Sequence, residues 1–467
     1  MRKPFLPLLF ACVSVLDAQT PPPAPAQQPA AEPQLSPQAA YDQATRPLDI
    51  VRRSPQNWSE IELNALKAAR NQAAEACSAR DPEQFEADDL LALCHLCAFG
   101  QKWQPVFAAA SKYLDPFRPK VPGAAPKTLA NLSVAYDWKV QGSLNLDEPF
   151  LALQTAQTML RSVPYDEFAS EATNSTARYL HFLHSSEALA LLAQRQPLIL
   201  AELKARANPP PENRDSAPAT HPPLPLYALY SDALALPAMQ QFLNQTNPAA
   251  ESYQDLEAAL PTSLSSEDGM FIAEKRRQYL LLGSHLPVIA AMGSLLAPDA
   301  PTPKLNGPFT AATVLMLFPD WCNQCIAMAF NSPPRAKELL ETYHARFFPL
   351  ITQADPPEKH AQAPLKDVPL PPSKSAKGAS TAPSGKLHVD QQINVTSTPD
   401  ARLAGTPTVV VPNETLNTFT ATDFPLLIVL DHEGIIRAIL VAPEDALAPG
   451  GDVDQLVHHV VDTWPPP

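Results

Sequence analysis

The spacing of apolar and polar residues divides the chain into two parts with different periodicity. From residue 51 to residue 298, apolar side chains recur at steps of three and four, which is the period of amphipathic helices. This pattern predicts an all-helical domain at 51–298, with its first helices at 60–79, 88–99 and 103–114. A proline-rich break at 208–225 interrupts this domain.

Short apolar runs replace the helical period in the second part, at 299–467. Helices are expected at 326–346 and, with amphipathic spacing, at the end of the chain. Strands between helices indicate an α/β sandwich, so the predicted fold class is α + α/β with the helical domain first. The apolar runs predict strands at 312–318, 347–352, 386–395, 408–411, 426–430 and 435–441.

Two further segments have a composition that cannot build a packed core. Residues 19–50 are rich in proline, alanine and glutamine and are predicted to form a disordered tether. Residues 354–385 are of low complexity and are predicted to be a disordered insertion in the second domain. The chain holds 55 prolines among 467 residues, more than twice the usual share of about 5%, which indicates elements separated by stiff spacers.

The N-terminus has the pattern of a secretory signal. Arg2 and Lys3 precede a short apolar run, and Ala18 offers a small residue for cleavage, which predicts a signal peptide at 1–18. A lipid anchor on Cys12 is the weaker alternative. The mature protein is therefore expected to be extracytoplasmic, either periplasmic or secreted, where disulfides form and persist.

Charge and motif content exclude several function classes. The net charge is −14 and Lys and Arg do not cluster, so no nucleic-acid-binding surface is expected. No other apolar run reaches the ~18 residues of a transmembrane helix, so none is expected in the mature chain. Glycine-rich phosphate loops and the residue spacings of serine hydrolases are also missing from the sequence.

The sequence Cys322-Asn323-Gln324-Cys325 follows a predicted strand and opens a predicted helix. A Cys-x-x-Cys pair is a redox dithiol, half of a zinc site or two unrelated thiols. Structural zinc needs four ligands and no second close pair lies nearby, so no metal is expected. A helix N-terminus stabilises a thiolate, which favours Cys322 as nucleophile and Cys325 as resolving cysteine. The redox-active disulfide itself then serves in place of a cofactor.

Four features in order resemble the thioredoxin superfamily, and most closely its extracytoplasmic thiol–disulfide oxidoreductase branch. The resemblance covers about residues 300–467. It implies a thioredoxin-like domain that exchanges disulfides with protein thiols and works with an electron donor or acceptor that the sequence does not identify. The features are Trp321-Cys322-x-x-Cys325 after a strand, Phe424-Pro425 before the strand at 426–430, the turn from Asp431 to Gly434, and the final helix.

The resemblance also implies a cis-proline beside the dithiol. Pro425 is favoured for this position because one hairpin and one helix follow it, as that fold requires, while Pro407 is the alternative. Phe424, the residue before it, is implied to offer backbone hydrogen bonds to the partner chain, although it is bulkier than the usual Thr or Val. Trp321 is either a packing residue or a contact for substrates.

Two positions depart from related families. Met316 stands where cytoplasmic thioredoxins carry a buried carboxylate that moves protons, and Asp320, beside the motif, is expected to be solvated. A peroxidase of the peroxiredoxin type is disfavoured because Pro319 stands where a Thr or Ser is expected, three residues before Cys322. The dipeptide Asn323-Gln324 indicates no direction of exchange.

The helical domain contains a weaker resemblance, of about thirty residues, to one tetratricopeptide-type helical hairpin. It implies a protein partner for this domain. The alternative function is therefore a helical-repeat protein-binding module whose thioredoxin-like domain is a non-catalytic scaffold. The resemblance is carried by Gly100, Trp103, Val106, Ala110, Tyr113, Leu114 and Pro116.

Three more cysteines, Cys77, Cys94 and Cys97, lie in the helical domain. The pair Cys94 and Cys97 falls inside a predicted helix, so its thiols lack the field of a helix end. Three interpretations stay open: small buried hydrophobic residues, a structural disulfide from Cys77 to Cys94 or Cys97, and a metal site that includes His95. Cleavage after Ala18 leaves five cysteines, so at least one has no partner within the chain.

Overall fold

A computed structural model describes most of the helical and strand-forming parts of the chain. The predicted signal peptide at 1–18, with Cys12, and the predicted insertion at 354–385 lie outside the described residues. Within them, no helix has both the length and the apolar character to cross a membrane. The described residues are 35–53, 60–117, 125–207, 223–295, 304–305, 311–353, 403, 406–442 and 446–466.

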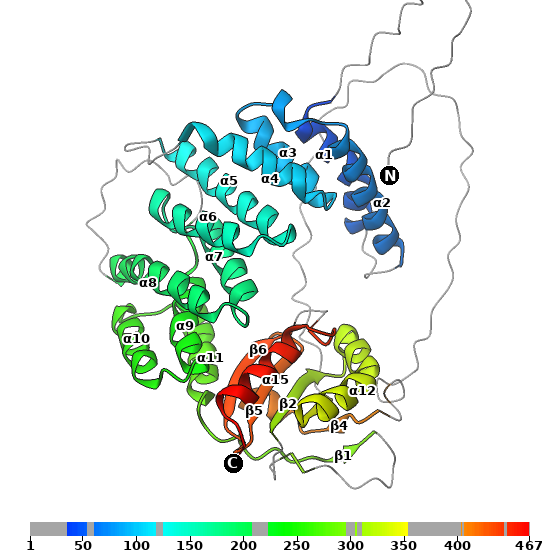
Figure 1. The fold of residues 1–467 in the computed structure, drawn as a ribbon, viewed down its shortest axis with the longest axis vertical. Helices are drawn as coiled ribbons and strands as arrows, with labels where there is room; N and C mark the ends of the chain where they lie inside the picture. The colour runs from blue at the N-terminus through cyan, green and yellow to red at the C-terminus, as the bar shows by residue number, and fades with distance from the viewer. Residues whose placement is uncertain are drawn as a thin grey trace, which may run out of the picture.

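The N-terminal part is a curved array of helices in which each packs against the next one in sequence, except that the last helix packs against the one two before it (Figure 1). The predicted helices at 60–79, 88–99 and 103–114 are confirmed to within one residue. The array consists of α1 (Pro37–Arg52), α2 (Glu60–Ser78), α3 (Asp88–Phe99), α4 (Trp103–Leu114), α5 (Pro126–Asn145), α6 (Pro149–Ser162), α7 (Glu167–Leu180), α8 (Ser185–Ala207), α9 (Leu226–Phe242), α10 (Thr246–Ala259) and α11 (Ser266–Leu281).

Glycine sets how closely two of these helices approach. A Cβ added at Gly100, at the end of α3, would lie 2.6 Å from the backbone N of Ala74 in α2. Backbone atoms of a helix cannot move aside for a side chain, so only glycine fits this contact. The small residue at this position therefore brings α2 and α3 into direct contact.

The helix α1 differs from the disordered tether predicted at 19–50. Ser36 caps it, since its Oγ accepts a hydrogen bond from the backbone N of Ala39, and Pro37 is tolerated in the first turn. Ala40, Ala44 and Leu48 are buried at steps of four, so this segment does have a face to pack. Its high content of proline and alanine masked this face in the sequence, while residues 19–34 lie outside the described part.

The C-terminal region contains a sheet that is six-stranded among the described residues, in the order β1-β4-β3-β2-β5-β6. The strand β2 runs parallel to β3 and antiparallel to β5, so the sheet is mixed. The chain is thus an α + β protein that is mostly helical. The strands are β1 (Gly293–Ser294), β2 (Ala312–Pro319), β3 (Ala345–Thr352), β4 (Val409–Val410), β5 (Leu426–Asp431) and β6 (Ile436–Val441).

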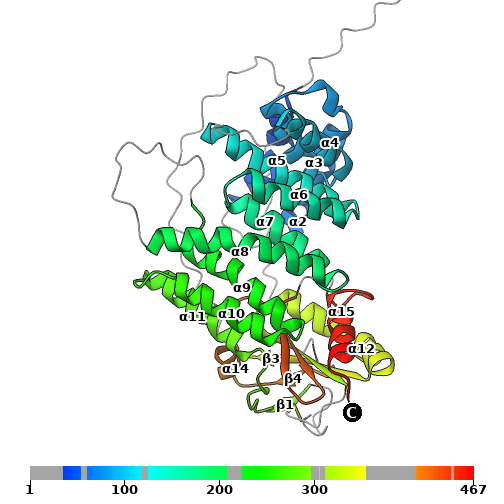
Figure 2. The same cartoon turned by 60° about the vertical axis from the view of Figure 1, so that its left-hand side comes forward.

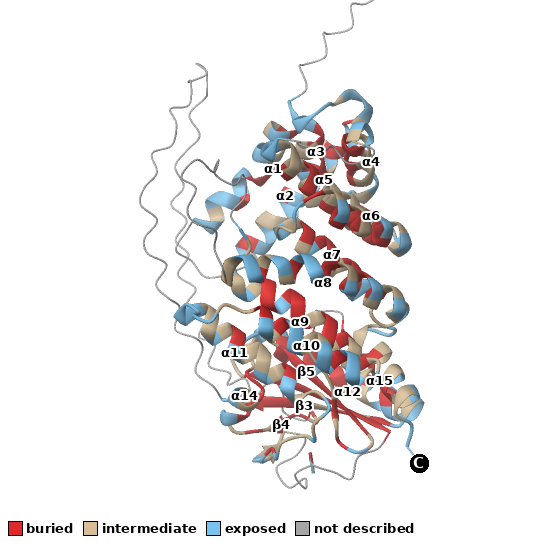
Figure 3. Cartoon of the chain, turned by 90° about the vertical axis from the view of Figure 1, so that its left-hand side faces the viewer, coloured by how far each residue is buried: buried red, intermediate tan, exposed pale blue. Residues whose placement is uncertain are grey.

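Both faces of the central strands are covered, which explains their largely apolar sequence. Val314 and Met316 of β2 pack in a cluster with α12 (Asn323–Tyr343) and α15 (Asp452–Thr463). Leu315 of β2 points to the opposite face, into a second cluster with Ile289. Figure 3 shows buried residues filling the sheet and the facing sides of the helices.

The segment after α11 belongs with the sheet, although the sequence pattern placed it in the helical domain up to residue 298. The backbone N of Gly283 donates to the O of Ile436 at 2.8 Å, and the N of Ile436 donates to the O of Ser284 at 2.8 Å. Leu282 and Leu286 pack against the second apolar cluster of the sheet. Their apolar spacing is compatible with a helix, and contact with the sheet makes the segment extended instead.

The helical array and the sheet are in direct contact. Figure 2 shows α9, α10 and α11 next to the strands. His459 of α15 stacks on Phe242 of α9 with ring centroids 3.9 Å apart, and its Nε2 lies 3.0 Å from the Phe242 carbonyl oxygen. Gln278 of α11 donates to the carbonyl oxygen of Thr420 at 2.9 Å. These contacts fix the last helices of the array against the sheet.

Candidate functional site

The cysteines of the Cys-x-x-Cys sequence form a disulfide at the start of α12. Cys322 is the N-cap residue, and its Sγ accepts a hydrogen bond from the backbone N of Cys325 at 3.3 Å. Cys322 is half-buried while Cys325 is completely buried. Of the two cysteines, Cys322 is therefore the one with part of its surface open to a partner.

The local field favours a negative charge on Cys322. The backbone N–H groups of the first helical turn point toward the N-cap position, where they stabilise a thiolate. The first turn of α12 carries no acidic side chain that would oppose this effect. When the disulfide opens, the N–H of Cys325 already lies within hydrogen-bonding distance of the Cys322 sulfur.

The peptide bond between Phe424 and Pro425 is cis, whereas that between Thr406 and Pro407 is trans. Pro425 directly precedes β5, and its carbonyl oxygen accepts a hydrogen bond from the backbone N of Ala442 at 2.9 Å. The cis peptide bond therefore lies at Pro425, as the sequence argument favoured, and not at Pro407.

Phe424 and Trp321 lie together beside the dithiol. Their rings meet edge to face, with centroids 5.5 Å apart. Both side chains are half-buried, and the buried Nε1 of Trp321 has no hydrogen-bond partner among the described residues. Trp321 thus packs against the segment before the cis-proline and keeps part of its ring at the surface.

The position six residues before Cys322 is apolar. Met316 is completely buried and lies opposite Leu427 of β5, in the same apolar cluster as Cys325. Asp320 is half-buried, and its backbone N donates to the carbonyl oxygen of Thr352 at 2.9 Å. Met316 cannot carry a proton to or from Cys325.

The hairpin between β5 and β6 is built around Asp431, which is completely buried. Its carboxylate accepts hydrogen bonds from the backbone N of Glu433 at 2.9 Å and from the Nε of Arg437 at 2.7 Å. The guanidinium of Arg437 also lies over the ring of Trp464, 4.1 Å from its centroid. The predicted turn from Asp431 to Gly434 is present and has a structural role.

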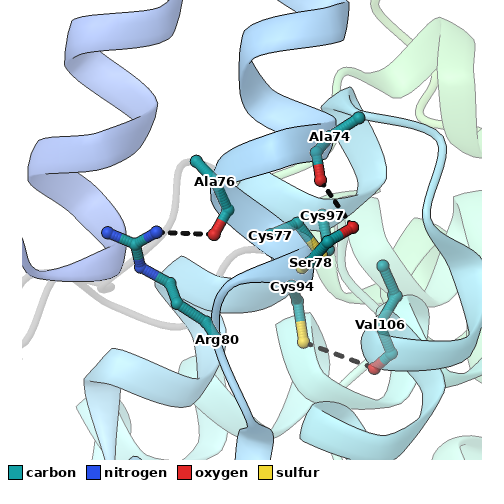
Figure 4. Close-up of a disulfide and its surroundings, with 8 residues drawn as sticks. All are labelled: Ala74, Ala76, Cys77, Ser78, Arg80, Cys94, Cys97 and Val106. Carbon is teal, nitrogen blue, oxygen red and sulfur yellow. Dashed lines mark hydrogen bonds between the residues drawn. A yellow bond between two sulfur atoms is a disulfide. The ribbon is translucent and has the colours of Figure 1, made fainter. Parts of the chain in front are cut away.

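A second disulfide joins Cys77 of α2 to Cys97 of α3 (Figure 4). Both residues are completely buried. Cys94 remains free, with its Sγ 3.6 Å from the carbonyl oxygen of Val106, and burial raises the pKa of its thiol. The structural-disulfide interpretation, with Cys97 as the partner, is the one that this geometry supports.

His95 takes part in packing. Its ring stacks on Tyr41 of α1 with centroids 4.0 Å apart, and burial lowers its pKa. In the part of the chain that the structure describes, no three His, Cys, Asp or Glu side chains form a group that could hold a metal ion.

The sequence analysis missed a cavity of about 630 Å³ between the helical array and the sheet. Its walls come from α7, α9, β6 and α15, segments that are up to 285 residues apart in sequence (Glu171 to Leu456). Such a site has no local sequence signal, because each wall by itself follows the apolar pattern of an ordinary helix or strand.

One wall of the cavity is held by a buried polar network around Asp232. Its carboxylate accepts hydrogen bonds from the hydroxyls of Tyr165 at 2.7 Å and Ser170 at 2.6 Å. Arg195, completely buried, donates to the carbonyl oxygen of Asp232 and to the Oδ1 of Asn174, both at 2.6 Å. These bonds tie α7, α8 and α9 together and give the cavity a rigid wall.

His181 also lines the cavity and is surrounded by aromatic rings. Phe182 and Phe242 lie with centroids 4.6 Å and 4.7 Å from its ring. Burial, followed by the nearby His459, lowers the pKa of His181 to about 4. The histidine is therefore neutral at the contact between array and sheet under ordinary conditions.

No protein-family model, no curated protein and no solved structure matches this chain. Function is therefore inferred from its own residues. Chemically, a half-buried Cys322 bonded to a buried Cys325 is suited to a reversible two-electron couple in which the outer sulfur exchanges with an incoming thiolate.

Proposed function

We propose that the chain is an extracytoplasmic thiol–disulfide oxidoreductase that exchanges disulfides with protein thiols through Cys322 and Cys325. The observation that carries the proposal is the disulfide at the N-terminus of α12, accessible on the Cys322 side and adjacent to the cis Phe424–Pro425 bond. The β3-β2-β5-β6 order, with α12 and α15 packed on one face, supports a thioredoxin-like domain.

The exchange proceeds in two balanced steps. A substrate thiolate attacks the Cys322 sulfur, which forms a mixed disulfide and releases Cys325 as a thiolate. A second substrate thiolate then attacks the substrate sulfur of the mixed disulfide, which forms the substrate disulfide and releases Cys322 as a thiolate. The protein gains two electrons and the substrate loses two, and reduction of a substrate follows the same steps in reverse.

Neighbouring residues position this exchange. The N-terminus of α12 stabilises the Cys322 thiolate as it leaves. Phe424 and Trp321 give the dithiol an apolar border, and the backbone of Phe424 is available for hydrogen bonds to the partner chain. Because the buried Met316 cannot exchange a proton, Cys325 takes up its proton from the solvent or the substrate and releases it to them.

Two features support the proposed location and partners. A completely buried structural disulfide between Cys77 and Cys97 is typical of proteins that fold in an oxidising compartment. The same location is expected from the signal peptide predicted at 1–18. Substrate proteins and a separate electron donor or acceptor are the expected partners, and the helical array is the expected binding surface for one of them.

The second candidate is a helical-repeat binding module whose sheet domain is a non-catalytic scaffold. Met316 favours it, since the apolar residue removes the buried proton carrier of cytoplasmic thioredoxins. In this case Cys322 and Cys325 form a permanent bridge. The two candidates differ in whether the bridge opens and closes reversibly.

A redox titration of the mature protein in defined dithiol buffers, combined with mass tagging of thiols, tests the proposal. We expect a reversible two-electron couple at Cys322 and Cys325 and turnover in an insulin-reduction assay. Cys322→Ser abolishes the turnover, whereas Cys94→Ser, a matched change at a buried thiol far in sequence from α12, leaves it intact. A Cys322→Ser protein with full activity, or a bridge that never opens, overturns the proposal.

A further inference from the structure

The cavity between the array and the sheet is bordered by the outer edge of strand β6. Ala438 and Leu440 belong to the apolar cluster on one face of the sheet, and Ile439 belongs to the cluster on the other face. Nevertheless all three residues, with Val441 and Ala442, line the same cavity. Alternate side chains point to opposite faces of a strand, so a cavity that touches consecutive residues faces the strand edge.

The hydrogen-bond pattern shows which backbone groups point into the cavity. The backbone N of Ala442 donates to the O of Pro425, which makes these two residues a hydrogen-bonded pair of the antiparallel ladder. Such pairs alternate along a ladder, so Leu440 and Ala438 also bond toward β5. The N–H and C=O groups of Ile439 and Val441 therefore point outward, and they have no hydrogen-bond partner there among the described residues.

The first half of this edge already pairs with another segment of the chain. Gly283 and Ser284 exchange hydrogen bonds with Ile436, and the N of Leu286 donates to the O of Gly434 at 2.9 Å. The pairing stops where α11 ends at Leu281 and the chain turns away into a helix. Leu282 marks the start of the cavity. The edge of β6 therefore continues along the cavity beyond this pairing, and there its outward backbone groups are unpaired among the described residues. A strand added at this place extends the line of the segment that begins at Gly283.

The wall opposite β6, part of which contacts the strand, carries small and apolar side chains. Three alanines, Ala177, Ala235 and Ala238, face the cavity from α7 and α9. Phe182 and Phe242 supply apolar surface on the same side. A volume of about 630 Å³ lies in the usual range of sites that bind a ligand, ~300–1,000 Å³.

We propose that this edge binds an extended apolar segment of the polypeptide substrate by adding it as a strand to β6. The segment bonds to the backbone of Ile439 and Val441 and places an apolar side chain against Phe182 and Phe242. Main-chain bonds give such a site affinity for unfolded chains in general, while the apolar wall selects the segment. The proposal names the substrate class of the dithiol and in this respect rests on the proposed function.

The bound segment lies within reach of the dithiol. Val441 lies opposite Leu426 of β5, and Leu426 lies opposite Leu317 of β2, the strand that leads to Cys322. Three strand spacings of ~4.8 Å separate the added strand from β2, or about 14 Å. An extended chain covers this in about four or five residues, at ~3.3 Å each. A cysteine at that spacing from the bound segment can reach Cys322.

The test uses the whole mature protein and a fluorescent peptide that contains five consecutive apolar residues and, five positions away, one Ser or one Cys. Binding of the Ser peptide is read by anisotropy, and exchange with the Cys peptide is read by mass tagging. Val441→Pro removes one outward N–H but no bond to β5, a change that an edge strand tolerates. Val288→Pro is the matched control, because Val288 is 89% exposed and lies outside the cavity wall.

We expect Val441→Pro to weaken peptide binding about tenfold and Val288→Pro to leave it unchanged. Ala238→Phe, which fills the cavity, is the second variant and is expected to weaken binding likewise. Reduction of the Cys322–Cys325 disulfide by dithiothreitol stays the same in all variants. A peptide N-methylated at consecutive amides, which leaves neither of its edges able to pair, is expected not to bind.

Peptide binding that survives both Val441→Pro and Ala238→Phe overturns the proposal. Equal binding of the N-methylated peptide also overturns it, because the cavity then holds side chains or small molecules without strand addition. If the peptide binds as expected but the dithiol never exchanges, strand addition stands and the oxidoreductase function fails. The two proposals are thus tested separately.

Discussion

The rings of Trp321 and Phe424 meet at 87° with centroids 5.5 Å apart, although about one hundred residues separate them in sequence. Trp321 precedes the nucleophilic position of the proposed dithiol, and Phe424 precedes the cis-proline. This contact therefore connects the turn that presents Cys322 to the segment proposed to bind the partner chain.

A double-mutant cycle of Trp321→Ala and Phe424→Ala measures this connection. An edge-to-face aromatic pair contributes ~1 kcal/mol beyond its buried area. We expect a coupling of this size in the free energy of unfolding, together with a coupled loss in the rate of exchange with protein thiols. The same cycle on Tyr227 and Phe271, which stack 4.9 Å apart in the helical array, is the control. It is expected to affect stability alone, and a coupled effect on exchange there contradicts the assignment.

The disulfide in the helical domain is expected to stabilise the protein without taking part in exchange. The bond between Cys77 and Cys97 closes a loop with a sequence separation of 20 residues, so its removal by paired Ala substitutions costs ~3 kcal/mol of unfolding free energy. Chemical denaturation measures this loss, and the insulin-reduction rate is expected to stay unchanged. Cys94→Ala, a nearby buried cysteine with no bridge, is the control and is expected to cost less.

His181 is expected to make stability fall with acidification. The folded protein holds it neutral down to about pH 4, while the unfolded chain binds a proton below about pH 6.5. Because the unfolded state binds more protons between these pH values, the stability that the neutral His181 contributes is complete above pH 6.5 and is lost as the pH falls toward 4. Of the charged and titratable groups, His459 acts on this histidine, and Arg178 and Asp452 line the same cavity.

Denaturation of His181→Gln between pH 7 and pH 4 checks this prediction. The variant is expected to lose less unfolding free energy over this range than the unsubstituted protein. His458→Gln, a change of an exposed histidine on α15, controls for the loss of an imidazole. Parallel pH profiles of His181→Gln and the unsubstituted protein contradict the prediction.

Asp137 is expected to make the stability fall as the pH rises, which is the opposite of the effect of His181. Burial raises its pKa to about 7, and its Oδ1 accepts one hydrogen bond, from Gln141 at 3.3 Å. Between about pH 4 and pH 7 the folded state keeps a proton that the unfolded chain releases, so the contribution is complete below pH 4 and is lost as pH rises through 7. Asp137→Asn is therefore expected to raise the melting temperature at pH 8 and to change it little at pH 4. Asp255→Asn, at an exposed position of α10, is expected to change neither.

Much of the fold and the dithiol could be predicted because local sequence determines them. The strand β2 is apolar except at Thr313 and is buried at every position, since both its faces are covered, and Cys322 caps α12 shortly after it. The turn at Asp431 likewise depends on residues within six positions of one another. Each of these signals is contained in a short stretch of chain.

Other features depend on contacts that no local pattern encodes. Cys94 and Cys97 lie three residues apart on α3, and the choice of partner for Cys77 depends on which of them faces α2. In the fold Cys97 faces α2, while Cys94 points to Val106 of α4. The cavity beside β6 depends on how α7 and α9 meet the sheet, so only the folded chain reveals it.

The stacking of His459 on Phe242 determines how this protein can be divided. Buried apolar residues of the helices, Met239 and Phe242 among them, belong to the same cluster as Leu456 and Val460 of α15. A fragment restricted to 299–467 loses this cover and the segment from Gly283 to Leu286, which leaves β6 as a bare edge prone to aggregation. The sheet domain is consequently not an independent folding unit. A fusion protein that incorporates it must also include α9 and α11.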